Sequence, residues 1–149
     1  MRNREALYRQ VEAFRQAFSV GKGPVDVFAL CEQIPRLELR QIVLKTHGLN
    51  GVFMRGENMD LIMLNAGRNR KEQMFDLSHE LMHWWLHKDR SSRGRDDLAE
   101  WQANEGAAEL LVPWKELVQR VYECRKALHS AENLRRFTTA QAERCGVIS

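Results

Sequence analysis

The feature that most constrains this chain is the pentad His79-Glu80-Leu81-Met82-His83. On an α-helix, residues four apart lie one turn apart and about 40° from eclipsed. Both imidazoles can therefore reach one tetrahedral Zn²⁺, while Glu80 lies to the side, where it can touch a metal-bound water without binding the metal. The pentad predicts a zinc site of the hydrolase kind, provided that it lies on a helix.

The residues around the pentad predict that helix and its burial. Residues 74–86 are apolar on nearly every side, a pattern typical of a helix inside a domain. Asn69 followed by Glu72 predicts a capping box at its start, and the polar residues 88–95 end it. Buried histidines need partners, because unpaired polar groups away from water are costly, and a zinc ion would satisfy both.

The remaining segments predict an α+β fold. Four further helices are expected, at residues 5–18, 25–33, 96–112 and 114–128, the last with Pro113 at its first position. Three short extended segments are expected at residues 37–40, 51–55 and 61–64. Together they predict a small antiparallel sheet of about three strands, packed on a helical, zincin-like core that carries the pentad on its buried helix.

Length, cysteines and charge narrow the class of protein. The 149 residues predict one domain, residues 1–149, and no apolar run approaches the roughly 20 residues of a membrane helix. Three widely spaced cysteines match neither a disulfide framework nor a cysteine-based zinc site, so a cytoplasmic protein with no membrane contact is expected. Basic clusters occur at residues 68–71, 88–95 and 135–136, but the net charge is only +3. This small charge argues against direct DNA binding, which is the weakest alternative function.

A catalytic zinc usually has three protein ligands and an open position for water. The helix after the polar loop offers three carboxylates, Glu100, Glu105 and Glu109. Helical angles place Glu100 in the middle of a small, apolar face, whereas the other two point about 140° and 180° away. Glu100 is therefore the expected third ligand. Asn104, one turn beyond it, is placed to accept a hydrogen bond from the ring nitrogen of a ligating histidine that faces away from the metal.

These two motifs resemble those of the ImmA/IrrE metallopeptidases. The pentad, a short loop and the segment from Glu100 to Pro113 are similar to that family's helix-borne HExxH and the ExxANxFAAELLxP segment that follows. The resemblance covers about residues 24–113. It implies a gluzincin-like site with one Zn²⁺ per chain, held by His79, His83 and Glu100, with Glu80 as general base.

The resemblance also implies a substrate class. Members of the family cleave bacterial or phage repressors of the helix-turn-helix type, which lifts repression in mobile elements or stress responses. The reaction implied here is therefore endopeptidase cleavage of such a repressor. In helix-first zinc peptidases an edge strand often holds the substrate backbone, although this sequence does not indicate which strand that would be.

Two departures from the family pattern stand out. Gly106 occupies a position where the family usually has an aromatic residue, so looser packing behind the zinc is expected. Residues 130–149 resemble the start of the family's helical tail and then stop, so an incomplete tail is expected.

The second oxyanion donor and one alternative function stay open at this point. Tyr122, His87 and His129 are candidate donors, and the sequence favours none of them. The alternative is a catalytically silent zinc-binding or regulator-binding module of an antitoxin-like or sequestering type. Glu80 argues against it, because a structural zinc site needs no acid–base residue.

Overall fold

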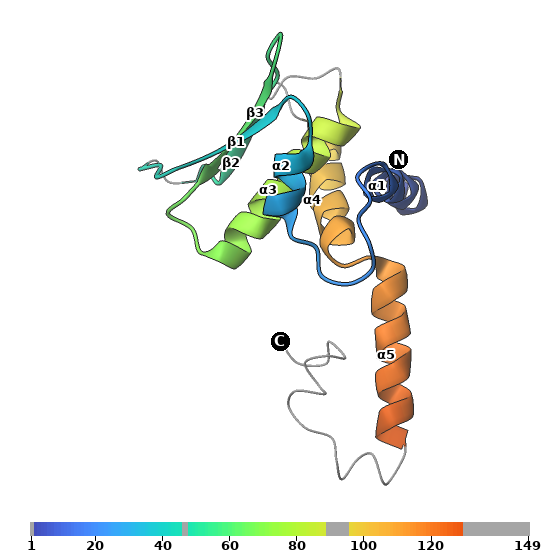
Figure 1. Ribbon diagram of the computed structural model, residues 1–149. Helices are drawn as coiled ribbons and strands as arrows, with labels where there is room; N and C mark the ends of the chain where they lie inside the picture. Colours follow the sequence, from blue (N-terminus) through green and yellow to red (C-terminus); the bar gives the residue numbers. More distant parts are fainter. Residues whose placement is uncertain (1, 46–47, 89–95, 130–149) are drawn as a thin grey trace. The chain divides into compact units, whose positions relative to one another are not determined.

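The computed structural model describes residues 2–45, 48–88 and 96–129 (Figure 1). The chain divides into two compact units, Met1–Leu111 and Val112–Ser149, and each is described by itself. The predicted tail at residues 130–149, the basic cluster at 135–136 and residues 89–95 of the basic cluster at 88–95 lie outside the described residues. Among the described helices, none is long and apolar enough to cross a membrane.

The first unit combines helices with a small sheet, so the predicted α+β class is confirmed. Its elements in chain order are α1 (Arg4–Ala17), α2 (Val27–Gln33), β1 (Leu37–Ile42), β2 (Gly51–Met54), β3 (Asp60–Asn65), α3 (Arg70–Leu86) and α4 (Asp97–Leu111). Helix α3 lies between the sheet and α4 (Figure 1). It carries the pentad, and it begins with the predicted capping box between Asn69 and Glu72.

The sheet is mixed, which corrects the prediction of an antiparallel one. The strand order is β1-β3-β2, with β2 antiparallel to β3 and β1 parallel to it. After β1 the chain runs to the opposite edge of the sheet, forms β2, and returns through a tight connection as the central strand β3. Alternating side chains in the sequence indicate which face of a strand is buried, but not which strand lies in the middle.

The core of this unit lies on both sides of α3. Phe53, Ile62 and Leu64 from the sheet are at most 1% exposed, as are Leu77 and Leu81 of α3. This packing makes α3 the central helix of the unit, as its apolar sequence predicted.

Small residues of α4 bring it close to α3. Ala103 and Ala107 are fully buried, and a Cβ added to Gly106 would lie 3.0 Å from Met82 Cγ and 3.1 Å from Met82 Sδ. Met82 itself is fully buried. The methionine therefore occupies the space that a larger residue at position 106 would need, and the expectation of loose packing behind the pentad is wrong.

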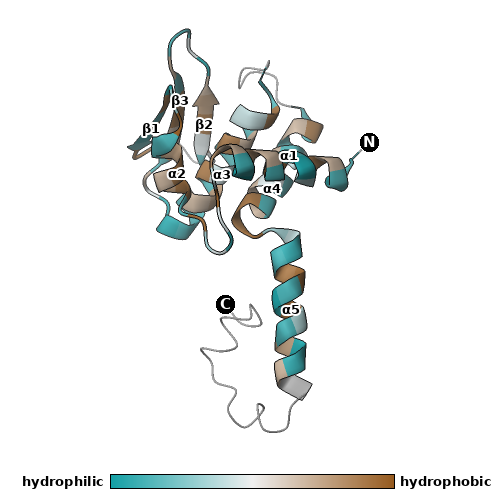
Figure 2. Cartoon of the chain, turned by 45° about the vertical axis from the view of Figure 1, so that its right-hand side comes forward, coloured by the Kyte–Doolittle hydropathy of each residue, from teal (hydrophilic) through white to brown (hydrophobic). Residues whose placement is uncertain are grey.

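The second unit contains α5 (Trp114–His129). The Leu117 N–H donates to Pro113 O at 3.0 Å, which agrees with the predicted place of the proline at the helix start. Hydrophobic and hydrophilic residues are interspersed along α5 (Figure 2). Cys124 on this helix is disulfide-bonded, so the expectation that no cysteine forms a disulfide is wrong for this residue. Cys31, in α2, is a buried free thiol.

Candidate metal centre

Two imidazoles of α3 face the same point in space. His79 and His83 lie one helical turn apart, and their Nε2 atoms are 3.1 Å from each other. The rings meet edge to face, with centroids 4.7 Å apart. The side chain of His83 is 3% exposed and that of His79 is 14% exposed, so the first is enclosed and the second borders an opening. This is the geometry that the spacing of the pentad predicted on a helix.

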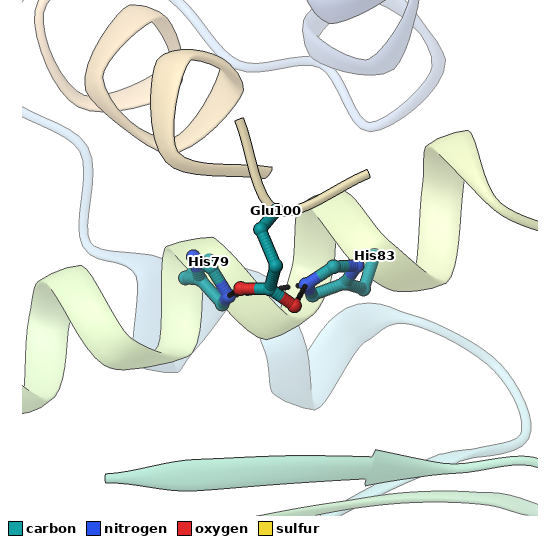
Figure 3. Close-up of side chains that lie close together, drawn as sticks. All are labelled: His79, His83 and Glu100. Carbon is teal, nitrogen blue, oxygen red and sulfur yellow. Dashed lines mark hydrogen bonds and ion pairs between the residues drawn. The ribbon is translucent and has the colours of Figure 1, made fainter. Parts of the chain in front are cut away.

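The third group comes from the first turn of α4. The two carboxylate oxygens of Glu100 lie 3.3 Å from His79 Nε2 and 3.2 Å from His83 Nε2 (Figure 3). The side chain reaches this position because α4 begins close to α3, where Asp96 accepts the Ala99 N–H at 2.7 Å. In the part of the chain that the structure describes, His79, His83 and Glu100 form a group able to hold a metal ion, with ligand atoms within 4.8 Å of one another.

The donor chemistry of this group fits a divalent cation. The ring of His79 is fixed from behind, since its Nδ1 lies 2.9 Å from Asn104 Oδ1, an acceptor. A hydrogen on Nδ1 leaves the Nε2 lone pair facing His83 and Glu100. Two imidazole nitrogens and one carboxylate oxygen are ligands that Zn²⁺ favours, and three such acceptors would repel one another without a cation between them.

His83 is fixed in a similar way by His87, which the sequence offered only as a candidate oxyanion donor, and by Gln102, which the sequence did not indicate. Its Nδ1 lies 3.0 Å from His87 Nδ1, and His87 Nε2 lies 2.9 Å from Gln102 Oε1. The signal available in the sequence was the continuation of the His79–His83 spacing to His87. The contribution of Gln102 depends on how α3 and α4 cross, which spacing alone does not reveal.

Glu80 and two of the candidate ligands, His79 and Glu100, border a common cavity of about 440 Å³. Glu80 is 3% exposed and lines the cavity together with His79, Glu100 and Asn104. Opposite them, residues 48–51 lead into β2 and form another wall. A Cβ added to Gly51 would lie 3.2 Å from Glu80 Cγ, so the backbone of β2 lies close to Glu80 and a side chain at position 51 would crowd it.

A partly buried ion pair also lines the cavity. Arg68 Nε donates to Asp76 Oδ2 at 2.6 Å and Arg68 Nη2 to Asp76 Oδ1 at 3.4 Å, and both residues line the cavity with Phe75. The hydrogen bonds to Asp76 raise the pKa of the Arg68 guanidinium above its usual range. The cavity is therefore lined by a cationic donor as well as by two candidate metal ligands.

The other sequence candidates lie elsewhere. Glu105 contacts α1, with Arg4 Nε at 3.3 Å and Tyr8 Oη at 3.4 Å, and is absent from the metal-binding group. Of the candidate oxyanion donors, His87 has both ring nitrogens engaged by His83 and Gln102. Tyr122 lies on α5 in the second unit, and the side chain of His129 lies outside the described residues.

Comparison with known proteins agrees with these observations. The family model described as the IrrE N-terminal-like domain (Peptidase_M78) matches residues 36–145, a span that contains the sheet, α3, α4 and every residue of the candidate metal centre. No curated protein matches the chain. Since the matched span is well over half of the 149 residues, the chain belongs to the IrrE N-terminal-like family of peptidase domains.

Proposed function

We propose that this protein is a zinc endopeptidase that cleaves a helix-turn-helix transcriptional repressor. The observation that carries the proposal is the convergence of His79, His83 and Glu100 at the wall of a cavity that Glu80 also lines, in a peptidase-family fold. A Zn²⁺ bound there would polarise the scissile carbonyl and acidify the attacking water. His79, His83 and Glu100 would hold it, which leaves one tetrahedral position open.

Glu80 is the proposed general base and acid. Its carboxylate would accept a proton as a water oxygen bonds to the peptide carbonyl carbon. It would then deliver that proton to the amine nitrogen as the C–N bond breaks. The position suits both transfers, because Glu80 borders the cavity between the candidate ligands and the β2 wall. Its near-complete burial also keeps bulk water from competing for the proton.

The edge strand β2 is the proposed support for the substrate backbone. The Asn65 N–H donates to Asn50 O at 2.9 Å, so the regular alternation of an antiparallel pair turns the backbone groups of Gly51 and Phe53 away from β3. A Cβ added to Gly51 would lie 3.2 Å from Glu80 Cγ, so this part of β2 lies close to the candidate base. A peptide added at this edge in extended form would pass directly over the candidate base.

The proposal of a repressor as substrate follows from the family resemblance of the two motifs. A cytoplasmic location, in bacteria or in cells that carry a phage, is proposed with it. The cavity supports a peptide substrate in general. It offers an extended backbone edge along β2 and a guanidinium at Arg68, which suits a carbonyl or carboxylate oxygen of the peptide.

Incubation with the repressor encoded in the neighbouring reading frame tests the proposal. Glu80→Gln should retain zinc and lose cleavage by about a hundredfold or more, because the amide cannot accept the proton. His79→Ala should lose both zinc and cleavage. Glu105→Gln, a charge-removing change on the α1 side of α4, is the matched control and should cleave at the wild-type rate.

Cleavage by Glu80→Gln at the wild-type rate would contradict the mechanism. A stoichiometric complex of the wild-type chain with the repressor, with zinc bound and no product formed, would instead favour the silent regulator-binding module.

A further inference from the structure

The contacts behind His83 form a chain of hydrogen bonds with a direction. His83 Nδ1 and His87 Nδ1 are 3.0 Å apart, and His87 Nε2 and Gln102 Oε1 are 2.9 Å apart. His87 is held in place by its own backbone, whose N–H donates to His83 O at 3.1 Å at the end of α3. Three side chains from two helices are therefore joined in one line.

Only one of the two facing Nδ1 atoms can carry the hydrogen of their contact. If it lies on His83, the His83 Nε2 lone pair is available to a metal, and His87 accepts at Nδ1 and must donate from Nε2. If it lies on His87, a neutral His83 carries its hydrogen on Nε2 and cannot bind a metal there. His87 would then need a donor at its own Nε2.

The amide of Gln102 distinguishes these two states. Its oxygen faces His87 Nε2 and can only accept, which requires a hydrogen on that nitrogen; in a neutral His87 this leaves Nδ1 as an acceptor and therefore favours the metal-ready form of His83. The opposite orientation would present the NH₂ group to His87 and favour the blocked form. The orientation of one side-chain amide thus sets the tautomer of a buried imidazole two hydrogen bonds away.

We propose that His87 and Gln102 are positioning residues that hold His83 in the tautomer able to bind a metal at Nε2. This inference rests on the proposed metal centre. With Asn104 behind His79, helix α4 then supplies one ligand, Glu100, and the terminal acceptor for each of the two histidines. Both imidazoles of α3 are oriented from the same neighbouring helix.

Zinc affinity, measured by competition with a chromophoric chelator, is the first test. Gln102→Met keeps the length of the side chain and removes the acceptor, and it should weaken zinc binding about tenfold or more, as loss of a ligand's supporting hydrogen bond usually does. Gln102→Glu retains an obligatory acceptor and should bind zinc at least as tightly as the wild type. Gln119→Met, the same substitution on α5, is the matched control and should leave the affinity unchanged.

The tautomer itself is the second test, because the negative charge of Gln102→Glu could tighten zinc binding by itself. In the metal-free protein, Glu100 Oε1 at 3.2 Å and His79 Nε2 at 3.1 Å draw a hydrogen to His83 Nε2, so the change in the fraction of the Nδ1–H form is what the test measures. Nitrogen-15 spectra should show a larger fraction of His83 protonated at Nδ1 in the wild type and in Gln102→Glu than in Gln102→Met. His87→Phe should lower this fraction as well, and His87→Gln should restore it, because its side-chain oxygen can accept from His83.

Zinc affinity in Gln102→Met and His87→Phe within about twofold of the wild type would overturn the inference. An equal fraction of the His83 Nδ1–H form in metal-free wild type and in metal-free Gln102→Met would overturn it as well. If the wild-type protein cleaves its substrate and the zinc affinities of Gln102→Met and His87→Phe are unchanged, the positioning role is rejected and the proposed function stands. A wild-type chain that binds no zinc, but whose fraction of the His83 Nδ1–H form falls in Gln102→Met, would reject the metal centre and retain the hydrogen-bond chain.

Discussion

The contact between Gly106 and Met82 predicts a substitution whose effect on stability changes sign with its background. Gly106 lies inside α4, where replacement by alanine should stabilise an unstrained helix by about 1 kcal/mol. The added Cβ, however, would lie 3.0 Å from Met82 Cγ and 3.1 Å from Met82 Sδ. Because Met82 is fully buried, it has little room to move, and overpacking of this kind costs about 1 to 3 kcal/mol.

The net effect of Gly106→Ala alone should therefore be a destabilisation of about 0 to 2 kcal/mol. Met82→Ala removes both crowding atoms and should itself cost about 2 to 5 kcal/mol. In that background Gly106→Ala meets no obstacle, fills part of the new cavity, and should stabilise by about 1 kcal/mol. The two substitutions should consequently show a coupling of about 1 to 3 kcal/mol, within the range found for residues in contact.

Urea unfolding of the four members of this cycle measures the coupling. Ala108→Gly, at an exposed position of the same helix, calibrates the intrinsic difference between glycine and alanine and should have the same effect in both backgrounds. Additive free energies of unfolding for Gly106→Ala and Met82→Ala would refute the reasoning, because they would show that Met82 does not limit the space at position 106.

Three further predictions concern the cavity, the metal and the buried thiol. Gly51→Val should lower the rate of peptide cleavage about tenfold or more with little change in zinc affinity. The reason is that the valine side chain would displace Glu80 Cγ, which lies 3.2 Å from the Cβ position of residue 51. Equal losses of cleavage rate and zinc affinity would contradict this prediction. Chelator treatment should lower the melting temperature, and zinc at about a hundred times its Kd should restore about 2.7 kcal/mol of stability. Calorimetry measures both changes, and His79→Ala is the control, because zinc should not stabilise this variant. Burial raises the pKa of the Cys31 thiol from 9.0 to about 11, so thiol reagents at pH 8 should react with it far more slowly than with unfolded protein, and the free energy of unfolding should fall as the pH rises from 9 to about 11. Equal labelling rates in native and urea-unfolded protein would count against that last expectation.

Local patterns predicted the elements of the site well. The capping box at Asn69 and the apolar residues around the pentad depend on neighbours within a few positions, and these interactions are the same in a peptide and in a domain. The angular argument for Glu100 agrees with the position of its carboxylate, which lies 3.3 Å from His79 Nε2 and 3.2 Å from His83 Nε2.

Arrangements that depend on how elements meet were not predictable in the same way. The parallel pairing of β1 with β3 depends on the path of the chain between β1 and β2, and alternation within a strand carries no information about that path. The same holds for Gln102, whose contact with His87 requires the crossing of two helices to be known. Met82 is a further example, since a flexible side chain filled the space that the family's aromatic residue would occupy.

Helix α4 touches the candidate metal centre at three points spaced along its first two turns, Glu100, Gln102 and Asn104. An axial slip of a single residue, about 1.5 Å, would misalign all three contacts together. Loading with metal should therefore slow amide hydrogen exchange throughout α4 in a concerted manner, and a protease added to metal-depleted protein should find its first cleavage sites there rather than in the sheet.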